Sequence, residues 1–204
     1  MLQYSALPAK TLEALKTLKN VPELNQFALV GGTALALHWG HRISVDLDFF
    51  SPSVFDPDKI ISALNNAGKL HIADKNHYSV FATFNDVKLD LIKTPYTWFS
   101  EPPLIDGFRI AELDDIAALK MNALYGRGVK KDFYDFYFLL KKYSLTELTH
   151  LFTKKFPNTN PMGLLLSLNY FEDAEQSETP ITTDQSLTWE EVKKFITQQV
   201  KEFM

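Results

Sequence analysis

The sequence predicts an α+β fold, in which a mixed sheet with flanking helices is followed by a C-terminal helical bundle. Up to about residue 100, short apolar runs typical of strands alternate with helical patterns, and turn residues separate them. Beyond that point, apolar residues recur mostly at helical spacing. We therefore expect an α/β core over residues 1–100 and a helical domain over residues 101–204.

The elements of the first half follow from local patterns. Asp56, Pro57 and Gly68 are typical of a helix N-cap, a first turn and a helix end, so a helix is expected between them. The dipeptide Asn85-Asp86 is typical of a tight hairpin between two strands. The expected helices cover residues 8–19, 33–40 and 57–67, and the expected strands cover 27–31, 44–50, 69–74, 78–84 and 87–92.

The second half begins after the proline-bearing connection "KTPYTWFSEPP". Asp114 is the expected N-cap of a helix that reaches about Tyr125, before the breaker "GRG". Further helices are expected over residues 131–142, 145–156 and 189–204, and residues 172–186 are expected to form an exposed loop.

The composition excludes several classes of protein. None of the 204 residues is cysteine, which excludes a disulfide scaffold, thiolate catalysis and a Cys-ligated zinc site. The N-terminal segment lacks the apolar core of a signal peptide, and no apolar run approaches membrane-spanning length. These observations favour a cytoplasmic protein that has no membrane partner.

The charge is unevenly distributed along the chain. The formal net charge of -4 argues against indiscriminate binding to nucleic acid. However, residues 120–155 hold eight Lys and Arg against three acids, whereas residues 171–191 hold seven acids and no Lys or Arg. Solvated surfaces explain both segments. Alternatively, the basic stretch binds a polyanion such as RNA through Arg127, Lys130, Lys131, Lys141 and Lys142.

Two aspartates interrupt an otherwise apolar strand. Because side chains two apart on a strand face the same way, Asp46 and Asp48 should project together while Leu47 and Phe49 point into the core. Two neighbouring carboxylates repel each other unless a cation lies between them, and magnesium is the usual oxygen-ligated cation. The pair therefore indicates a metal site, although a structural pair is the simpler interpretation.

A third strand acid strengthens the metal interpretation. In "VKLDLI", Asp90 faces away from the apolar side chains, and a paired sheet would bring it beside Asp46 and Asp48. Three carboxylates on adjacent strands are what a two-metal phosphoryl or nucleotidyl transfer site requires. We therefore expect these three aspartates to bind two magnesium ions.

The glycines ahead of the acids fit the same chemistry. Gly31-Gly32 lies where a strand turns into a helix, so backbone amides can meet a triphosphate without a Cβ in the way. Thr33 would add a hydroxyl, and Arg42 and Ser44 would hold phosphate oxygens.

The combination resembles a known family. "VGG", thirteen residues, "DLDF" and a later "LDL" are similar to the signature of the DNA-polymerase-beta-like nucleotidyltransferase superfamily. More narrowly, "GGTALALHWGHRISVDLDFF" and "LDDIAALKMNALYGRGVKKDFYDFYFLL" resemble the AbiEii/AbiGii toxins of bacterial abortive-infection and toxin–antitoxin systems. The resemblance covers about residues 27–142 and implies a nucleotidyltransferase-type sheet.

Two charged residues of the helical half have competing interpretations. Lys120 shares an apolar helix face with Ile116 and Leu124, which a lysine snorkelling at the edge of the packing explains. The resemblance instead implies that Lys120 reaches the bound triphosphate. Asp132 either compensates the dipole at a helix start or, as the resemblance implies, is a catalytic residue paired with Lys120; Asp135 is a weaker candidate.

These observations predict a magnesium-dependent nucleotidyltransferase that transfers NMP from an NTP to an acceptor hydroxyl. The resemblance implies a toxin of an abortive-infection or toxin–antitoxin system. Its expected partners are two Mg²⁺ ions, an NTP, a tRNA-like RNA acceptor and a cognate antitoxin. Two alternatives stay open: a catalytically idle nucleotide-binding module that acts through a protein partner, and a metal-dependent phosphodiesterase, which would leave Gly31-Gly32 without a purpose.

Overall fold

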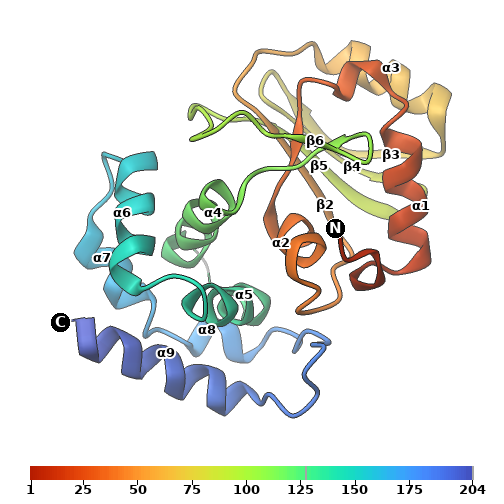
Figure 1. Cartoon of the computed structure of the whole chain (residues 1–204). Coiled ribbons are helices and arrows are strands. Elements are labelled where there is room, and N and C mark those ends of the chain that lie inside the picture. Colours follow the sequence, from red (N-terminus) through yellow and green to blue (C-terminus); the bar gives the residue numbers. More distant parts are fainter. Residues whose placement is uncertain (127, 204) are drawn as a thin grey trace. The chain divides into compact units, whose positions relative to one another are not determined.

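The computed structural model describes residues 1–126 and 128–203, which form two compact units, Met1–Glu112 and Leu113–Met204. The first unit contains the sheet and the second is helical, so the predicted α+β fold is confirmed (Figure 1). Within the described ranges, no helix combines the length and the apolar character needed to cross a membrane.

The first unit is built on a five-stranded mixed sheet with the order β1-β2-β5-β4-β3. β2 runs parallel to β5, and the other neighbours are antiparallel. The left-handed backbone of Asn85 and Asp86 forms the predicted tight turn between β4 and β5. The strands are β1 (Ala28–Leu29), β2 (Leu47–Ser51), β3 (Leu70–Asn76), β4 (Ser79–Phe84) and β5 (Val87–Lys93).

Three α-helices pack against this sheet (Figure 1). α1 (Ala9–Leu18) contacts β5, α2 (Gly31–Trp39) contacts β2, and α3 (Pro57–Ala67) contacts β3 and β4. α3 begins as predicted, because the Asp56 side chain accepts hydrogen bonds from the backbone N–H groups of Asp58 and Lys59. The 3-10 helices η1 (Tyr4–Ala6) and η2 (Pro22–Leu24) flank α1.

The first unit extends beyond the predicted boundary at residue 100. β6 (Leu104–Ile105) and β7 (Phe108–Arg109) form a small hairpin that was not predicted, and its turn, Asp106-Gly107, has left-handed backbone at both residues. The following segment is held by β1, since Ala111 N–H donates to Leu29 C=O at 3.0 Å. Residues 101–112 therefore belong with the sheet.

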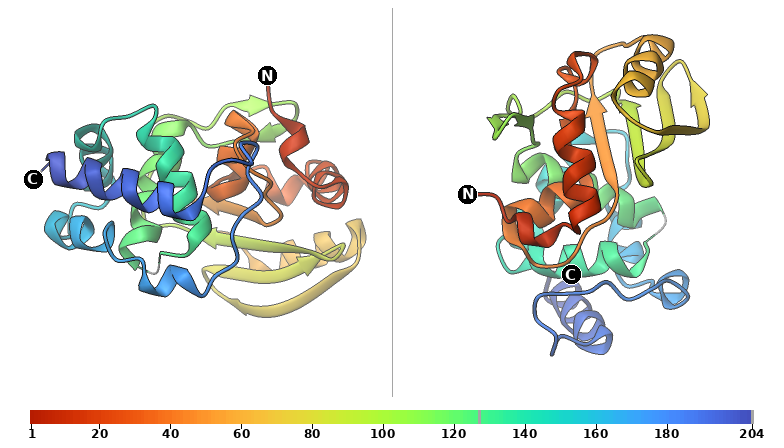
Figure 2. Two further views of the ribbon diagram at one scale, coloured as in Figure 1. Left: turned by 90° about the horizontal axis from the view of Figure 1, so that it is seen from below. Right: turned by 90° about the vertical axis from the view of Figure 1, so that its right-hand side faces the viewer.

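The second unit consists of helices, and α9 packs against α5 and α6 (Figure 2). α6 begins with a capping box between Ser144 and Glu147. The helices are α4 (Leu113–Gly126), α5 (Lys130–Leu140), α6 (Leu145–Lys155), α7 (Pro161–Ser167), α8 (Glu172–Glu175) and α9 (Trp189–Phe203).

Three details of the helical half differ from the sequence prediction. Asp114 lies in the first turn of α4 and not before it, and it accepts a hydrogen bond from the Tyr143 hydroxyl at 2.9 Å. α7 was not predicted, and the expected loop over residues 172–186 begins with α8. Arg127 and Met204 lie outside the described residues.

Candidate active site

Asp48 and Asp90 lie directly opposite each other on neighbouring strands. β2 and β5 pair in parallel, with Asp48 and Asp90 as register partners. The residues before them, Leu47 and Leu89, are also partners and are fully buried. Because side chains alternate along a strand, both carboxylates face away from the core on one side of the sheet. The structure thus brings together two acids that are 42 residues apart in the sequence.

Asp46 precedes the strand on which it was expected. β2 begins at Leu47, and the Asp46 carbonyl accepts a hydrogen bond from the Thr33 hydroxyl of α2 instead of joining the ladder. Asp46 and Asp48 are both partly buried, whereas Leu47 between them is buried. The expected alternation is therefore kept, although the strand is shorter than predicted.

The glycine turn leaves no room for a side chain beside the Asp48 carboxylate. Gly31 has a left-handed backbone (φ +69°), and a Cβ placed there would lie 2.7 Å from Asp48 Oδ2. The turn is fixed beside this strand because Val30 N–H donates to the Asp48 carbonyl at 2.8 Å. Val30 is the N-cap of α2 and makes no side-chain capping bond. Gly31, the first residue of α2, therefore lies close to a carboxylate, and its left-handed backbone favours glycine there.

Gly31→Ala should disturb the acids more than the fold. We expect the left-handed alanine to cost about 1–2 kcal/mol of stability, and its Cβ to push the Asp48 carboxylate aside. Gly40→Ala is the matched control, because Gly40 has nearly the same backbone (φ +66°) but faces the side chain of Gln3. Thermal unfolding should give similar losses for the two variants, whereas transfer activity should fall in Gly31→Ala alone. Equal activity in both would show that the close approach to Asp48 has no functional role.

The three polar residues predicted to hold phosphate have partners within the protein. Thr33 and Ser44 are buried, and the Thr33 hydroxyl lies 2.9 Å from that of Ser44. The Ser44 backbone N–H donates to Ala6 C=O at 2.9 Å. Arg42 is also buried, and its guanidinium donates to the Ile43 carbonyl at 3.0 Å. The segment that leads into Asp46 is therefore held to the start of α2 through Thr33 and to η1 through Ala6.

Lys88 joins the carboxylates, although it is not among the residues predicted from the sequence. It lies two residues before Asp90 on β5, and its ammonium donates to Asp90 Oδ2 at 2.8 Å. Partial burial lowers the pKa of Lys88, but the hydrogen bond to Asp90 and the charges of Asp90, Asp48 and Asp46 outweigh it and hold the pKa above its ordinary value. The ammonium therefore contacts Asp90 directly, and the more distant charges of Asp48 and Asp46 favour its protonated form.

The donor set fits a hard cation in residue type and backbone register. Asp90 Oδ1 is buried and has no hydrogen-bond partner among the described atoms, and Asp48 lies directly opposite it. Carboxylate oxygens are the ligands that magnesium prefers. Over residues 1–126 and 128–203, however, no three His, Asp or Glu side chains are placed to hold a metal ion. Metal binding would therefore require these side chains to turn toward one another.

In the second unit, Lys120 is buried between two carboxylates. Its ammonium lies 2.8 Å from Asp132 Oδ1 and 2.7 Å from Asp135 Oδ2, and all three side chains are at most 6% exposed. Lys120 therefore does not snorkel at the edge of the packing. The predicted pairing with Asp132 is present, and Asp135 is an equal partner. Asp132 Oδ2 is buried without a hydrogen bond in the part of the chain that the structure describes.

A second buried ion pair joins α4 to α6. Lys155 Nζ lies 2.6 Å from Asp115 Oδ1, and both side chains are at most 2% exposed. The sequence pattern did not predict this pair. Its partners come from two packed helices of the same unit, which indicates a structural role.

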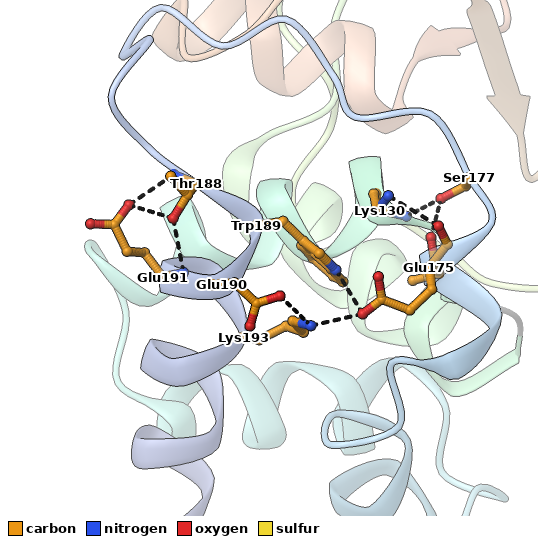
Figure 3. Close-up of polar contacts among 9 residues, drawn as sticks. Lys130, Glu175, Ser177, Thr188, Trp189, Glu190, Glu191 and Lys193 are labelled. Atoms are coloured by element: carbon orange, nitrogen blue, oxygen red, sulfur yellow. Dashed lines mark hydrogen bonds and ion pairs between the residues drawn. The ribbon is translucent and has the colours of Figure 1, made fainter.

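The acidic segment lies against part of the basic stretch (Figure 3). Lys130 donates from its backbone N–H to Ser177 Oγ at 2.9 Å and from its ammonium to the Glu175 carbonyl at 3.1 Å.

The Glu175 carboxylate accepts from Lys193 at 2.7 Å and Trp189 at 3.0 Å, and these bonds lower its pKa. Lys130 is therefore already engaged, whereas Lys141 and Lys142 are exposed, with the Lys141 ammonium 4.1 Å from the centroid of the Phe195 ring. Arg127 lies outside the described residues.

Comparisons with known proteins agree with the fold and the motifs. The model of the family described as "Nucleotidyl transferase AbiEii toxin, Type IV TA system" matches residues 13–202. An uncharacterized protein of Aquifex aeolicus (strain VF5) is 34% identical over 198 residues, which cover 94% of this chain and 95% of the relative.

Two solved structures share the fold over nearly the whole chain. A nucleotidyltransferase candidate from H. pylori has a TM-score of 0.59 and 21% identity, over 96% of this chain and 95% of its own. MenT4, a nucleotidyltransferase toxin of Mycobacterium tuberculosis H37Rv, has a TM-score of 0.56 and 13% identity, over 96% of this chain and 86% of its own. The resemblance seen in the sequence is confirmed, and the chain belongs to the AbiEii family of nucleotidyltransferase toxins.

Proposed function

We propose that this protein transfers a nucleoside monophosphate from an NTP to an acceptor hydroxyl in a magnesium-dependent reaction. One observation carries the proposal: Asp48 lies opposite Asp90 in the β2–β5 register, and Gly31 lies so close to the Asp48 carboxylate that an added Cβ would be 2.7 Å from Asp48 Oδ2. Nucleotidyl transfer needs acids that hold metal ions and backbone amides that bind phosphate. Asp48, Asp90 and Gly31 all lie in the first unit.

Each residue has a separate part in this proposal. Asp46, Asp48 and Asp90 would hold two magnesium ions, which supply charge neutralisation at the phosphates and lower the pKa of the acceptor hydroxyl. The amides of Gly31 and Gly32, at the N-terminus of α2, would bind the triphosphate.

The remaining predicted residues act less directly. Thr33 positions the loop, since its hydroxyl bonds to Asp46 C=O and Ser44 Oγ. Arg42 and Ser44 would reach phosphate only by leaving internal partners. For Lys120 and Asp132, a role in binding the triphosphate or in catalysis is supported by the family resemblance and by Asp132 Oδ2, which is buried and has no hydrogen-bond partner within residues 1–126 and 128–203.

Labelled nucleotides test the reaction class. The protein is incubated with magnesium, total RNA and NTPs labelled at the α- or γ-phosphate. Nucleotidyl transfer places α-label in RNA and none of the γ-label. If the labelled nucleotide is bound but not transferred, the protein is a catalytically idle nucleotide-binding module that acts through a protein partner. If the RNA is shortened, the protein is a phosphodiesterase. Label on protein instead of RNA would keep the chemistry but change the acceptor.

We further propose that the acceptor is a tRNA-like RNA and that a cognate antitoxin restrains the enzyme. The family description, a type IV toxin–antitoxin system, supports the antitoxin. The basic stretch supports RNA, and its exposed lysines, Lys141 and Lys142, are better placed for phosphate contacts than Lys130.

RNA binding through these lysines should depend on salt. Each phosphate contact contributes about 0.9 log units of affinity per log unit of salt for a duplex, or about 0.7 for a single strand. Reversing Lys141 and Lys142 to Glu should flatten that slope and reduce RNA labelling without changing NTP affinity. Lys10 and Lys16, exposed on α1, give the matched double reversal. If both double variants retain the wild-type slope, the basic stretch is only a solvated surface.

A further inference from the structure

Lys88 is placed where a cation is expected. Its ammonium bonds to Asp90 Oδ2 at 2.8 Å, and the charges of Asp46 and Asp48 act on it as well. The other oxygen of Asp90 is buried and unbonded within the described residues. Lys88 therefore neutralises part of the negative charge of Asp46, Asp48 and Asp90. It lies on the same strand face as Asp90.

The two partners differ in their freedom to move. The Asp90 side chain is 11% exposed, whereas that of Lys88 is 58% exposed. A lysine has a flexible four-carbon stem, so a half-exposed ammonium can leave its partner for water at little cost. The Asp90 carboxylate is held in the sheet, whereas the Lys88 ammonium can turn into solvent. The ion pair can therefore break and re-form.

We propose that Lys88 is a built-in counter-ion that competes with the metal ion for Asp90 and so sets the metal affinity of the site. The inference rests on the proposed function in taking Asp46, Asp48 and Asp90 as metal ligands. Lys88 offsets the charge of Asp90 when no ion is bound, and it must release Asp90 Oδ2 before that oxygen can bind an ion. Lys88 is thus a positioning residue and not a catalytic one.

Lys88→Met tests this competition, because methionine keeps most of the stem and removes the charge. Magnesium is titrated into each protein by calorimetry, and thermal unfolding is followed with and without magnesium. Lys75→Met is the matched control: Lys75 also lies on a strand of the sheet and pairs with a carboxylate, that of Asp58, at 2.5 Å. Lys88→Gln serves as a second variant if Lys88→Met folds poorly.

The competition predicts a specific pattern. Without magnesium, Lys88→Met should unfold at a lower temperature than wild type. At saturating magnesium, the two melting temperatures should be equal. Its magnesium affinity should be roughly fivefold tighter, with no change in Lys75→Met. In an Asp90→Asn background, Lys88→Met should change the affinity much less than in wild type, since the shared ligand is gone.

The outcomes separate this inference from the proposed function. Equal magnesium affinity in wild type and Lys88→Met would overturn the role of Lys88 and leave the metal site intact. Weaker binding in Lys88→Met would likewise overturn competition. An absence of binding in both proteins would overturn the metal site, and with it the role of Lys88. Binding in Lys88→Met alone would support the competition in its strongest form.

Discussion

Asp48→Asn is expected to reduce nucleotidyl transfer by about 10³-fold or more, since a metal ligand supports several kcal/mol of transition-state stabilisation. Asp46→Asn should behave in the same way. The fold should persist, because Asp48 shares its sheet face with Asp90 and their mutual repulsion is reduced. Without metal, the melting temperature of Asp48→Asn should therefore be unchanged or higher.

Rates measured with α-labelled NTP at saturating magnesium check this result. Asp74→Asn is the matched control, because Asp74 is an exposed acid on β3 of the same sheet. That variant should keep wild-type transfer. A marked loss of stability in Asp48→Asn with activity retained would mean that the Asp48 and Asp90 pair is structural.

Lys120→Met should have the largest effect on stability. It leaves the carboxylates of Asp132 and Asp135 buried without their cation, which typically costs about 3–5 kcal/mol. At roughly 4–8 °C per kcal/mol for a unit of this size, the melting temperature should fall by more than about 12 °C. Replacing both acids by Asn in the same variant should recover most of the loss, since neutral groups cost less to bury.

Lys155→Met is the control that distinguishes a loss of stability from a loss of nucleotide binding in Lys120→Met. Lys155 forms a comparably buried ion pair with Asp115 in the same unit, so its loss should destabilise the protein to a similar extent. Nucleotide titrations at fixed magnesium, well below both melting temperatures, should show weaker NTP binding in Lys120→Met than in Lys155→Met. Equal NTP affinity in the two variants would assign Lys120 a structural role alone.

Strand patterns predict only part of the arrangement of Asp46, Asp48 and Asp90. Alternation in the sequence places Asp46 and Asp48 together and Asp90 on a polar face. Their pairing depends on β5 inserting between β2 and β4, a non-local arrangement that the periodicity of one strand cannot specify. Lys88 could have been found, because the same period of two puts it on the face of Asp90.

The helical half shows a different limit. The apolar stripe of α4 predicts that Lys120 lies on a packed face. Its neutralisation by Asp132 and Asp135 depends on α5 packing against α4, which helical periodicity does not contain. The β6–β7 hairpin was missed because its strands have two residues each, although Asp106-Gly107 is a turn signal.

In the proposed reaction, the acids of the first unit catalyse displacement of pyrophosphate from an NTP. The most direct measurement counts pyrophosphate released and NMP incorporated in one reaction, in wild type and in Asp48→Asn. Wild type should give a one-to-one ratio that depends on magnesium, and Asp48→Asn should lose both signals together. Release of orthophosphate without pyrophosphate, or undiminished incorporation in Asp48→Asn, would contradict the proposed reaction.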